Sequence, residues 1–177
     1  MKKRVLSILL VVCLIVSLLP VSAFADEVDA SGTCGENVTW TLKDGVLTIS
    51  GTGAMEDYNW DSIPWRNYFD TIERIEVEDG VTNVGNYAFS DCTSLESIIL
   101  PDGLRSIGKR AFAWCWNLAV VTLPDGLESI DEAAFFDCNS LRDITIPEGV
   151  TDISYKAFYY CNSLSSVSIP KSVTSIS

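Results

Sequence analysis

The sequence of 177 residues contains no histidine. Histidine is the most common general base near neutral pH and the most common metal ligand, so its absence removes the usual centre of many catalytic and metal sites. The chain also contains no G-x-S-x-G motif and no Cys–His pair, and its glycines recur in Asp-Gly and Glu-Gly turns rather than in a phosphate-binding loop. These absences predict a protein that is not an enzyme and that needs no metal or other cofactor.

Positive charge is scarce. The chain has 12 Lys and Arg against 24 Asp and Glu, and three of the cations are Lys2, Lys3 and Arg4 at the amino terminus. No basic patch offsets the acidic excess, which repels nucleic acid and anionic membrane surfaces. We therefore expect no nucleic-acid partner.

Only one long apolar run occurs, and it lies at the start of the chain. The three cations precede apolar residues from Val5 to Leu19, and Ala23-Phe24-Ala25 supplies a small-x-small cleavage pattern. Residues 1–25 are thus predicted to be a Sec signal peptide, cleaved after Ala25. The run is short for a membrane anchor and no stop-transfer charges follow it. We expect a secreted or cell-surface protein without stable membrane insertion after cleavage.

A repeat of 23 residues organises the second part of the chain. Three residue types recur at this spacing without a slip. They are Phe89, Phe112, Phe135 and Phe158, then Cys92, Cys115, Cys138 and Cys161, and then Leu95, Leu118, Leu141 and Leu164. Such a period, with an L-x-x-I-x-I segment in each unit, is typical of a leucine-rich-repeat solenoid. Residues 72–177 would hold about four and a half units.

Each unit predicts one strand and one short helical segment. Apolar residues alternate in the segments at 95–100, 118–123, 141–146 and 164–169, as in a strand with one buried face, and a proline ends each of them. The following A-F-x-x-C-x-x-L run has helical spacing, so we predict a short helix or 3₁₀ turn on the convex side. Stacked units, roughly 4.8 Å apart at their strands, would share one core.

The regular cysteines have three interpretations. The favoured one is a structural ladder of small buried side chains, together with the four phenylalanines. Disulfides between neighbouring units are an alternative, since Cα atoms roughly 5 Å apart fall within the allowed window, although stacked side chains point in parallel. A reactive or metal-binding thiol is the third, but the spacing matches no zinc motif and no base activates the thiols.

The repeats resemble the BspA-type leucine-rich repeats of bacterial surface proteins. The resemblance is carried by the blocks ILPDGLRSIGKRAFAWCWNL and ITIPEGVTDISYKAFYYCNSL, in which the proline, the Ala-Phe pair and the cysteine fall in register. It implies non-enzymatic adhesion or protein–protein interaction, with a host matrix or neighbouring-cell protein as partner and a glycan as an alternative. A second interpretation is a structural or targeting module at the front of a longer exported enzyme or cell-wall protein.

Residues 26–71 are predicted to form an amino-terminal cap. Two alternating segments at 38–42 and 46–50 flank Lys43-Asp44-Gly45 and predict a β-hairpin, with Trp40, Trp60 and Trp65 closing the core. No capping unit follows the last repeat. We therefore expect a fragment of a longer chain, an exposed last unit, or a unit paired with a second copy.

Partner contacts are expected at variable positions on two faces. On the convex side these positions are aromatic, and aromatics are common interface anchors as well as ordinary packing residues. On the exposed strand face they are small and mostly neutral. The candidate partner-binding residues are Trp114, Trp116, Phe136, Tyr159 and Tyr160 on the convex side and Ile99, Val120 and Thr122 on the strand face.

Overall fold

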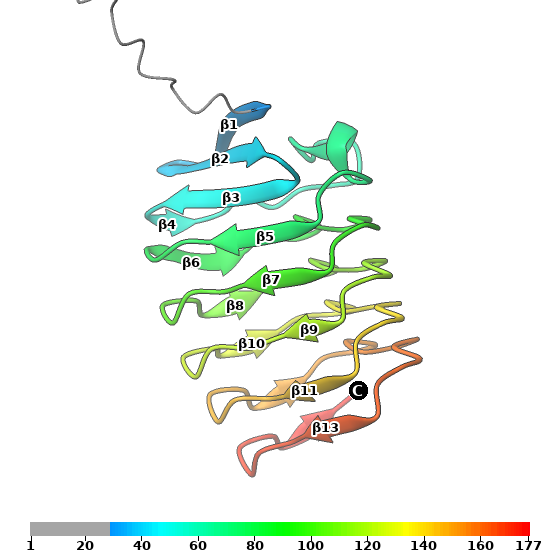
Figure 1. Ribbon diagram of the computed structural model, residues 1–177. Coiled ribbons are helices and arrows are strands. Elements are labelled where there is room, and N and C mark those ends of the chain that lie inside the picture. The colour runs from blue at the N-terminus through cyan, green and yellow to red at the C-terminus, as the bar shows by residue number, and fades with distance from the viewer. Residues whose placement is uncertain (1–28) are drawn as a thin grey trace, which may run out of the picture.

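The computed structural model describes residues 29–177, which wind into a stack of coils with strands on two sides (Figure 1). The predicted signal peptide, residues 1–25, lies outside the described residues. In each coil a strand on one side is followed by a turn and a second short strand on the opposite side, and the turn contains a proline in the last four coils. A turn-rich segment then leads to the next coil. We call this last side the turn edge.

The first side of the stack carries the strands predicted from the alternating segments. A six-stranded sheet has the order β1-β2-β3-β5-β7-β9, and a two-stranded sheet, β11-β13, continues it. The bounds are β1 Ala30–Gly35, β2 Val38–Lys43, β3 Val46–Gly51, β5 Arg74–Val77, β7 Ser97–Ile99, β9 Val120–Val121, β11 Asp143–Thr145 and β13 Ser166–Ser168.

The opposite side carries a second parallel sheet that the sequence pattern did not predict. Its order is β14-β12-β10-β8-β6-β4. The bounds are β4 Gly53–Ala54, β6 Val81–Val84, β8 Ser106–Ile107, β10 Ser129–Ile130, β12 Asp152–Ile153 and β14 Ser175–Ile176. The expectation of one strand per unit was wrong because these strands are mostly two residues long, too short to show alternation.

The cap is continuous with the solenoid. Asp44 and Gly45 have φ angles of 49° and 78°, as a type I′ turn requires, and they close the predicted antiparallel hairpin of β2 and β3. Strand β3 then pairs in parallel with β5, and β4 pairs in parallel with β6. The second hairpin strand is therefore also the first strand of the solenoid.

The turn edge contains no helix in the repeats, so the prediction of a helix or 3₁₀ turn there was wrong. Two residues in each of four successive coils have positive φ, which interrupts any helix. They are Tyr87 and Asp91, Arg110 and Trp114, Ala133 and Asp137, and Lys156 and Tyr160. Within the described residues the one helical element is a 3₁₀ turn, η2, at Arg66–Tyr68 in the cap.

Backbone hydrogen bonds at the turn edge run alternately within a coil and between coils. The N–H groups of Arg110, Phe112 and Trp114 donate to carbonyls of the next coil, whereas those of Ala111 and Ala113 close turns inside their own coil. The left-handed residues make this alternation possible, and it satisfies buried backbone groups without helix or sheet.

An aromatic ladder runs through the core beside this edge. Phe89, Phe112, Phe135 and Phe158 stack with ring centroids 5.2–5.4 Å apart. Trp65 of the cap stacks on Phe89 at 5.5 Å and starts the ladder. Because aromatic burial is a large part of core stability, this column couples the cap to the repeats.

Candidate functional site

The turn edge carries a row of neighbouring aromatic side chains across three coils. We call Trp114, Trp116, Phe136, Tyr159 and Tyr160 the aromatic strip. The Phe136 ring lies 5.6 Å from Trp114, 5.7 Å from Tyr159 and 5.8 Å from Tyr160 between centroids. Four of the five side chains named by the sequence are thus joined by ring contacts.

These residues are not equally accessible. Trp116, Tyr159 and Tyr160 are 48, 44 and 55 % exposed. Trp114 and Phe136 are half-buried, because their rings pack on their neighbours. The structure therefore leaves Trp116, Tyr159 and Tyr160 as the side chains that a partner could cover.

A row of polar side chains borders the aromatic strip. The Trp116 indole N–H donates to an Asp137 carboxylate oxygen at 3.3 Å. The amide of Asn139 donates to the other oxygen at 2.7 Å, and Asn162 in turn donates to Asn139. These contacts fix the Trp116 ring in one orientation and place polar groups at its border.

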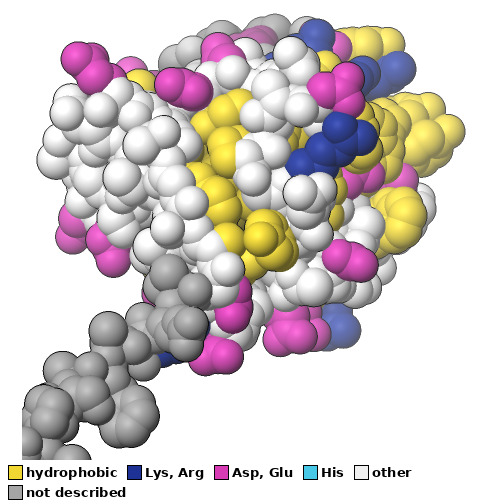
Figure 2. Space-filling model, turned by 90° about the horizontal axis from the view of Figure 1, so that it is seen from above, with side chains coloured by type: hydrophobic (Ala, Val, Ile, Leu, Met, Phe, Trp, Pro, Cys, Tyr) yellow, Lys and Arg dark blue, Asp and Glu magenta, His cyan; other side chains and the backbone are white. Residues whose placement is uncertain are grey.

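Two cations lie over the rings of this edge. The Arg110 guanidinium is 5.8 Å from the Tyr87 ring and 5.7 Å from the Trp114 ring. Lys156 is 4.8 Å from the Tyr155 ring and 5.2 Å from the Tyr159 ring. Figure 2 shows hydrophobic side chains projecting beside Lys and Arg at this side of the molecule.

Tyr155 is a member of this surface that the sequence analysis missed. Its side chain is 54 % exposed, and a hydrogen bond with it raises the pKa of Lys156. A hydrogen bond with Tyr159 raises the pKa of Tyr160. At neutral pH Lys156 is therefore charged and the Tyr160 phenol is neutral. Tyr155 was missed because the other coils have Asn86, Lys109 and Glu132 at its repeat position.

The three candidates on the strand face lie apart from the aromatic strip. Ile99 on β7 and Val120 on β9 are 48 and 63 % exposed, and Thr122 follows β9 with an exposed side chain. Their neighbours Ile98 and Val121 point into the core. The face is thus a small apolar patch beside polar residues.

The cysteine row is buried and its thiols are free. Cys92, Cys115 and Cys138 are fully buried and Cys161 is half-buried. The Sγ atoms of Cys115, Cys138 and Cys161 donate to the carbonyls of Phe89, Phe112 and Phe135 at 3.1–3.2 Å. Burial raises the pKa of the Cys92, Cys115 and Cys138 thiols, which opposes thiolate chemistry.

The loop of the cap displays one tryptophan that the sequence analysis placed in the core. Trp40 and Trp65 are buried as expected, but Trp60 is 40 % exposed. Its ring lies 5.9 Å from Phe69 and 5.4 Å from the Arg66 guanidinium. The assignment of Trp60 to the core was wrong because its loop is held outside the coil by its own polar contacts.

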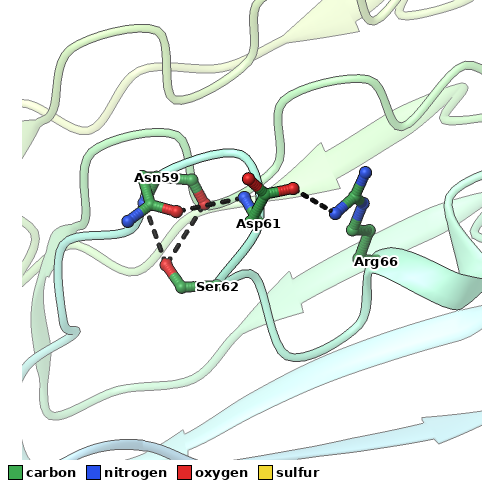
Figure 3. A network of polar contacts seen from close by, with 4 residues as sticks. All are labelled: Asn59, Asp61, Ser62 and Arg66. Atoms are coloured by element: carbon green, nitrogen blue, oxygen red, sulfur yellow. Dashed lines mark hydrogen bonds and ion pairs between the residues drawn. The ribbon is translucent and has the colours of Figure 1, made fainter.

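Figure 3 shows those contacts. Arg66 forms an ion pair with Asp61 at 2.6 Å, and the Asp61 N–H donates to the side chain of Asn59 at 3.1 Å. The Ser62 hydroxyl donates to the Asn59 carbonyl and accepts from the Asn59 N–H. The network orders the loop by bonds between residues that are close in the sequence.

Within residues 29–177, no His, Cys, Asp and Glu side chains gather in a group of three or more that could hold a metal ion. The same residues contain no helix of the length and apolarity needed to cross a membrane.

Comparison with known proteins finds a matching family and similar crystal structures. Residues 66–177, more than half of the chain, match the family described as "BspA type Leucine rich repeat region" in six copies. The crystal structure of a leucine-rich repeat protein from Eubacterium ventriosum is 34 % identical, with a TM-score of 0.74, over 84 % of this chain and 40 % of that one. No curated protein matches the sequence.

Two further crystal structures share the fold. A leucine rich cell surface protein from Faecalibacterium prausnitzii is 24 % identical, with a TM-score of 0.61, over 76 % of this chain and 38 % of that one. The pneumococcal vaccine antigen PcpA is 20 % identical, with a TM-score of 0.55, over 77 % of this chain and 36 % of that one. The chain spans about two fifths of the length of these solved structures.

Proposed function

The chain belongs to the family of BspA-type leucine-rich-repeat proteins, and on this premise we propose that it is an exported, non-enzymatic binding protein that adheres to another protein at or outside the cell surface. The proposed partner is a host matrix or neighbouring-cell protein. Export rests on the predicted signal peptide, residues 1–25. A structural relative whose name describes it as a cell surface protein supports the same location.

The observation that carries the binding role is the exposed part of the aromatic strip. Trp116 presents aromatic surface two coils before Tyr159 and Tyr160, and its indole N–H is held by Asp137 of the coil between them. Trp and Tyr are enriched among the residues that contribute most to protein–protein affinity. A ring held in one orientation also loses less conformational entropy on binding.

A protein partner is favoured over a glycan by the mixture of groups at this edge. Arg110 and Lys156 lie over rings of the edge beside the Asp137 carboxylate. Charges of both signs around aromatic anchors suit a protein surface, where complementary charges set orientation. Binding to a glycan instead of a protein is the alternative that a binding experiment has to separate.

The second candidate function is a structural or targeting module at the front of a longer exported enzyme or cell-wall protein. It is favoured by one observation, the match of this chain to about two fifths of longer relatives. In that case the solenoid would hold or space another domain, and the aromatic strip would have no ligand of its own.

We would test the proposal by measuring binding of the purified chain without its signal peptide to arrays of matrix proteins and of glycans. Saturable binding to a protein is expected. In Trp116→Ala/Tyr160→Ala it should weaken by at least about tenfold, the loss expected when anchor side chains are removed. Trp60→Ala is the matched control, since it removes an exposed tryptophan outside the aromatic strip.

The outcomes separate the alternatives. If Trp116→Ala/Tyr160→Ala and Trp60→Ala both bind as tightly as the unaltered protein, the proposed role of the aromatic strip is contradicted. Binding to glycans alone would replace the protein partner. A folded sample that binds nothing on either array would favour the structural module.

A further inference from the structure

The described stack has an unpaired strand edge at each end. Figure 1 shows β1 at one end and β13 at the other. Each is the last strand of its sheet, so one edge of each pairs with no described strand. Because β1 and β3 are both antiparallel to β2, and β3 is parallel to β5, β1 runs in the same direction as the repeat strands. A second copy stacked end on end would therefore continue the sheet, with its β1 parallel to β13.

Neither edge has the features that usually keep strands from pairing with another molecule. Natural edge strands are commonly protected by charged side chains, especially Lys, or by Pro. Strand β1 has the sequence ASGTCG and β13 has the sequence SVS, so both lack charge and proline. The unpaired backbone N–H and C=O groups of such an edge are a template for a further strand.

The last described coil, residues 154–177, exposes a surface that is buried between the other coils. Val167, Ile169 and Ile176 are 40, 47 and 64 % exposed, whereas the residues at the same positions one coil earlier are at most 6 % exposed. At the turn edge, the N–H groups of Phe158 and Tyr160 have no acceptor among the described residues, although their counterparts one coil earlier donate to carbonyls of this coil. The coil thus presents apolar side chains and backbone donors together.

The two ends of the stack carry opposite charge. The described part of the cap, residues 29–71, contains seven acidic residues and two cations. Two of the acidic residues, Asp29 and Glu36, flank β1 and are exposed. The last coil contains the cations Lys156 and Lys171 and no acidic residue. In a chain that has twice as many acidic residues as cations, this coil is a local reversal of charge.

We propose that the chain binds a second copy of itself head to tail, with β1 of one copy pairing in parallel with β13 of the next. The last coil of one copy, with its two lysines, then faces the acidic cap of the other copy. Val167, Ile169 and Ile176 are covered by this contact, as their counterparts are between coils.

Charge selects this arrangement over a two-fold one. Two last coils face to face would set cations against cations, and two caps would set acidic surfaces against each other, whereas cap against last coil is complementary. A head-to-tail contact uses a different surface on each copy, so it leaves a free cap and a free last coil on every pair. Further copies can therefore add at both ends.

Sedimentation velocity of the purified chain without its signal peptide tests the contact. The average mass should rise with protein concentration past the mass of a dimer. Raised salt should lower it, because part of the attraction is between charges near the surface. Circular dichroism of each sample shows whether the chain is folded.

Charge-reversal variants test which surfaces meet. Lys156→Glu/Lys171→Glu alters the last coil, and Asp29→Lys/Glu36→Lys alters the cap. Each variant alone should associate about tenfold or more weakly than the unaltered protein, because like charges then face each other. An equimolar mixture of the two variants should associate again, since every cap then meets a last coil of opposite charge.

The matched control is Arg105→Glu/Arg142→Glu. It makes the same change of net charge as the last-coil variant, but midway along the stack, and it should associate as the unaltered protein does. The adhesion proposed above is measured on arrays of other proteins, whereas self-association is measured on the chain alone. Either proposal can therefore fail without the other.

Four results would overturn the proposal. They are a folded chain that keeps the mass of a monomer at every concentration, a mass that stops at the dimer, charge-reversal variants that associate as strongly as the unaltered protein, and a mixture of the two variants that stays dissociated. A mass that stops at the dimer would indicate a two-fold contact instead, because only a self-complementary surface closes after two copies.

Discussion

The four regularly spaced cysteines have the same place in the repeat but different surroundings. Cys115 and Cys138 are fully buried, and each thiol donates to a phenylalanine carbonyl of the preceding coil. Cys161 is half-buried, and its contact with the neighbouring Cys138 thiol lowers the pKa of its own thiol. Since the thiolate is the reactive form, reactivity should follow this difference.

We predict an order of reaction with a thiol reagent at pH 8. Cys161 should react first in the native protein, while Cys92, Cys115 and Cys138 should react only as the protein unfolds, because burial raises their pKa and blocks access. Mass spectrometry of the modified peptides would give the order. In denaturant five thiols should titrate in the chain after signal cleavage, and fewer would contradict the free state of the row.

Individual core residues could be read from the sequence, but the orientation of surface aromatics could not. The exact spacing of Phe89, Phe112 and Phe135 predicts burial, and all three are fully buried. Nothing in the spacing says that Trp114 has a φ of 62° and packs on Phe136. Its half-burial depends on a backbone conformation that a ring-bearing residue rarely adopts.

At the scale of the element, the turn-rich segment depends on left-handed residues that are not glycine. Ala133 has a φ of 56° and is almost fully buried, whereas its neighbour Ala134 is equally buried and is not among the residues with positive φ. Alanine in a left-handed conformation costs about 1–2 kcal/mol that glycine avoids. The pair offers an internal comparison of that cost.

We predict that Ala133→Gly is less destabilising than Ala134→Gly by about 1–2 kcal/mol. Both substitutions remove a buried methyl group and add the same freedom to the unfolded chain, so these losses cancel in the comparison. Urea unfolding of the two variants would measure the difference. Equal losses of unfolding free energy would show that the strain at Ala133 is relieved elsewhere.

The elements differ in how far the sequence predicts them. The hairpin of β2 and β3 follows from alternation around Asp44-Gly45, which is a strong local signal. Strands such as β8 and β10 have two residues each, and their pairing comes from stacking between coils. A helical spacing in A-F-x-x-C-x-x-L was misleading, because consecutive turns also bring residues three and four apart to one side.

At the scale of the whole molecule, the stack depends on its cap. Trp65 is fully buried, its indole N–H donates to the Ala88 carbonyl at 2.8 Å, and its ring contacts Trp40 and Tyr58 as well as Phe89. In a solenoid each coil is stabilised mainly by its neighbours. The interface between cap and first repeat should therefore limit the stability of the coils that follow.

We predict that Trp65→Ala lowers the free energy of unfolding by about 3–5 kcal/mol, the range for removal of a buried tryptophan. Trp60→Ala, at an exposed position of the same loop, should cost less than about 1 kcal/mol. Urea unfolding followed by circular dichroism would measure both, and hydrogen exchange would show where protection is lost. Because the aromatic ladder continues from Trp65 through Phe89 and Phe112, protection in Trp65→Ala should fall in the repeats as well as in the cap. Loss confined to residues 29–71 would contradict this coupling and would make the repeats stable without their cap.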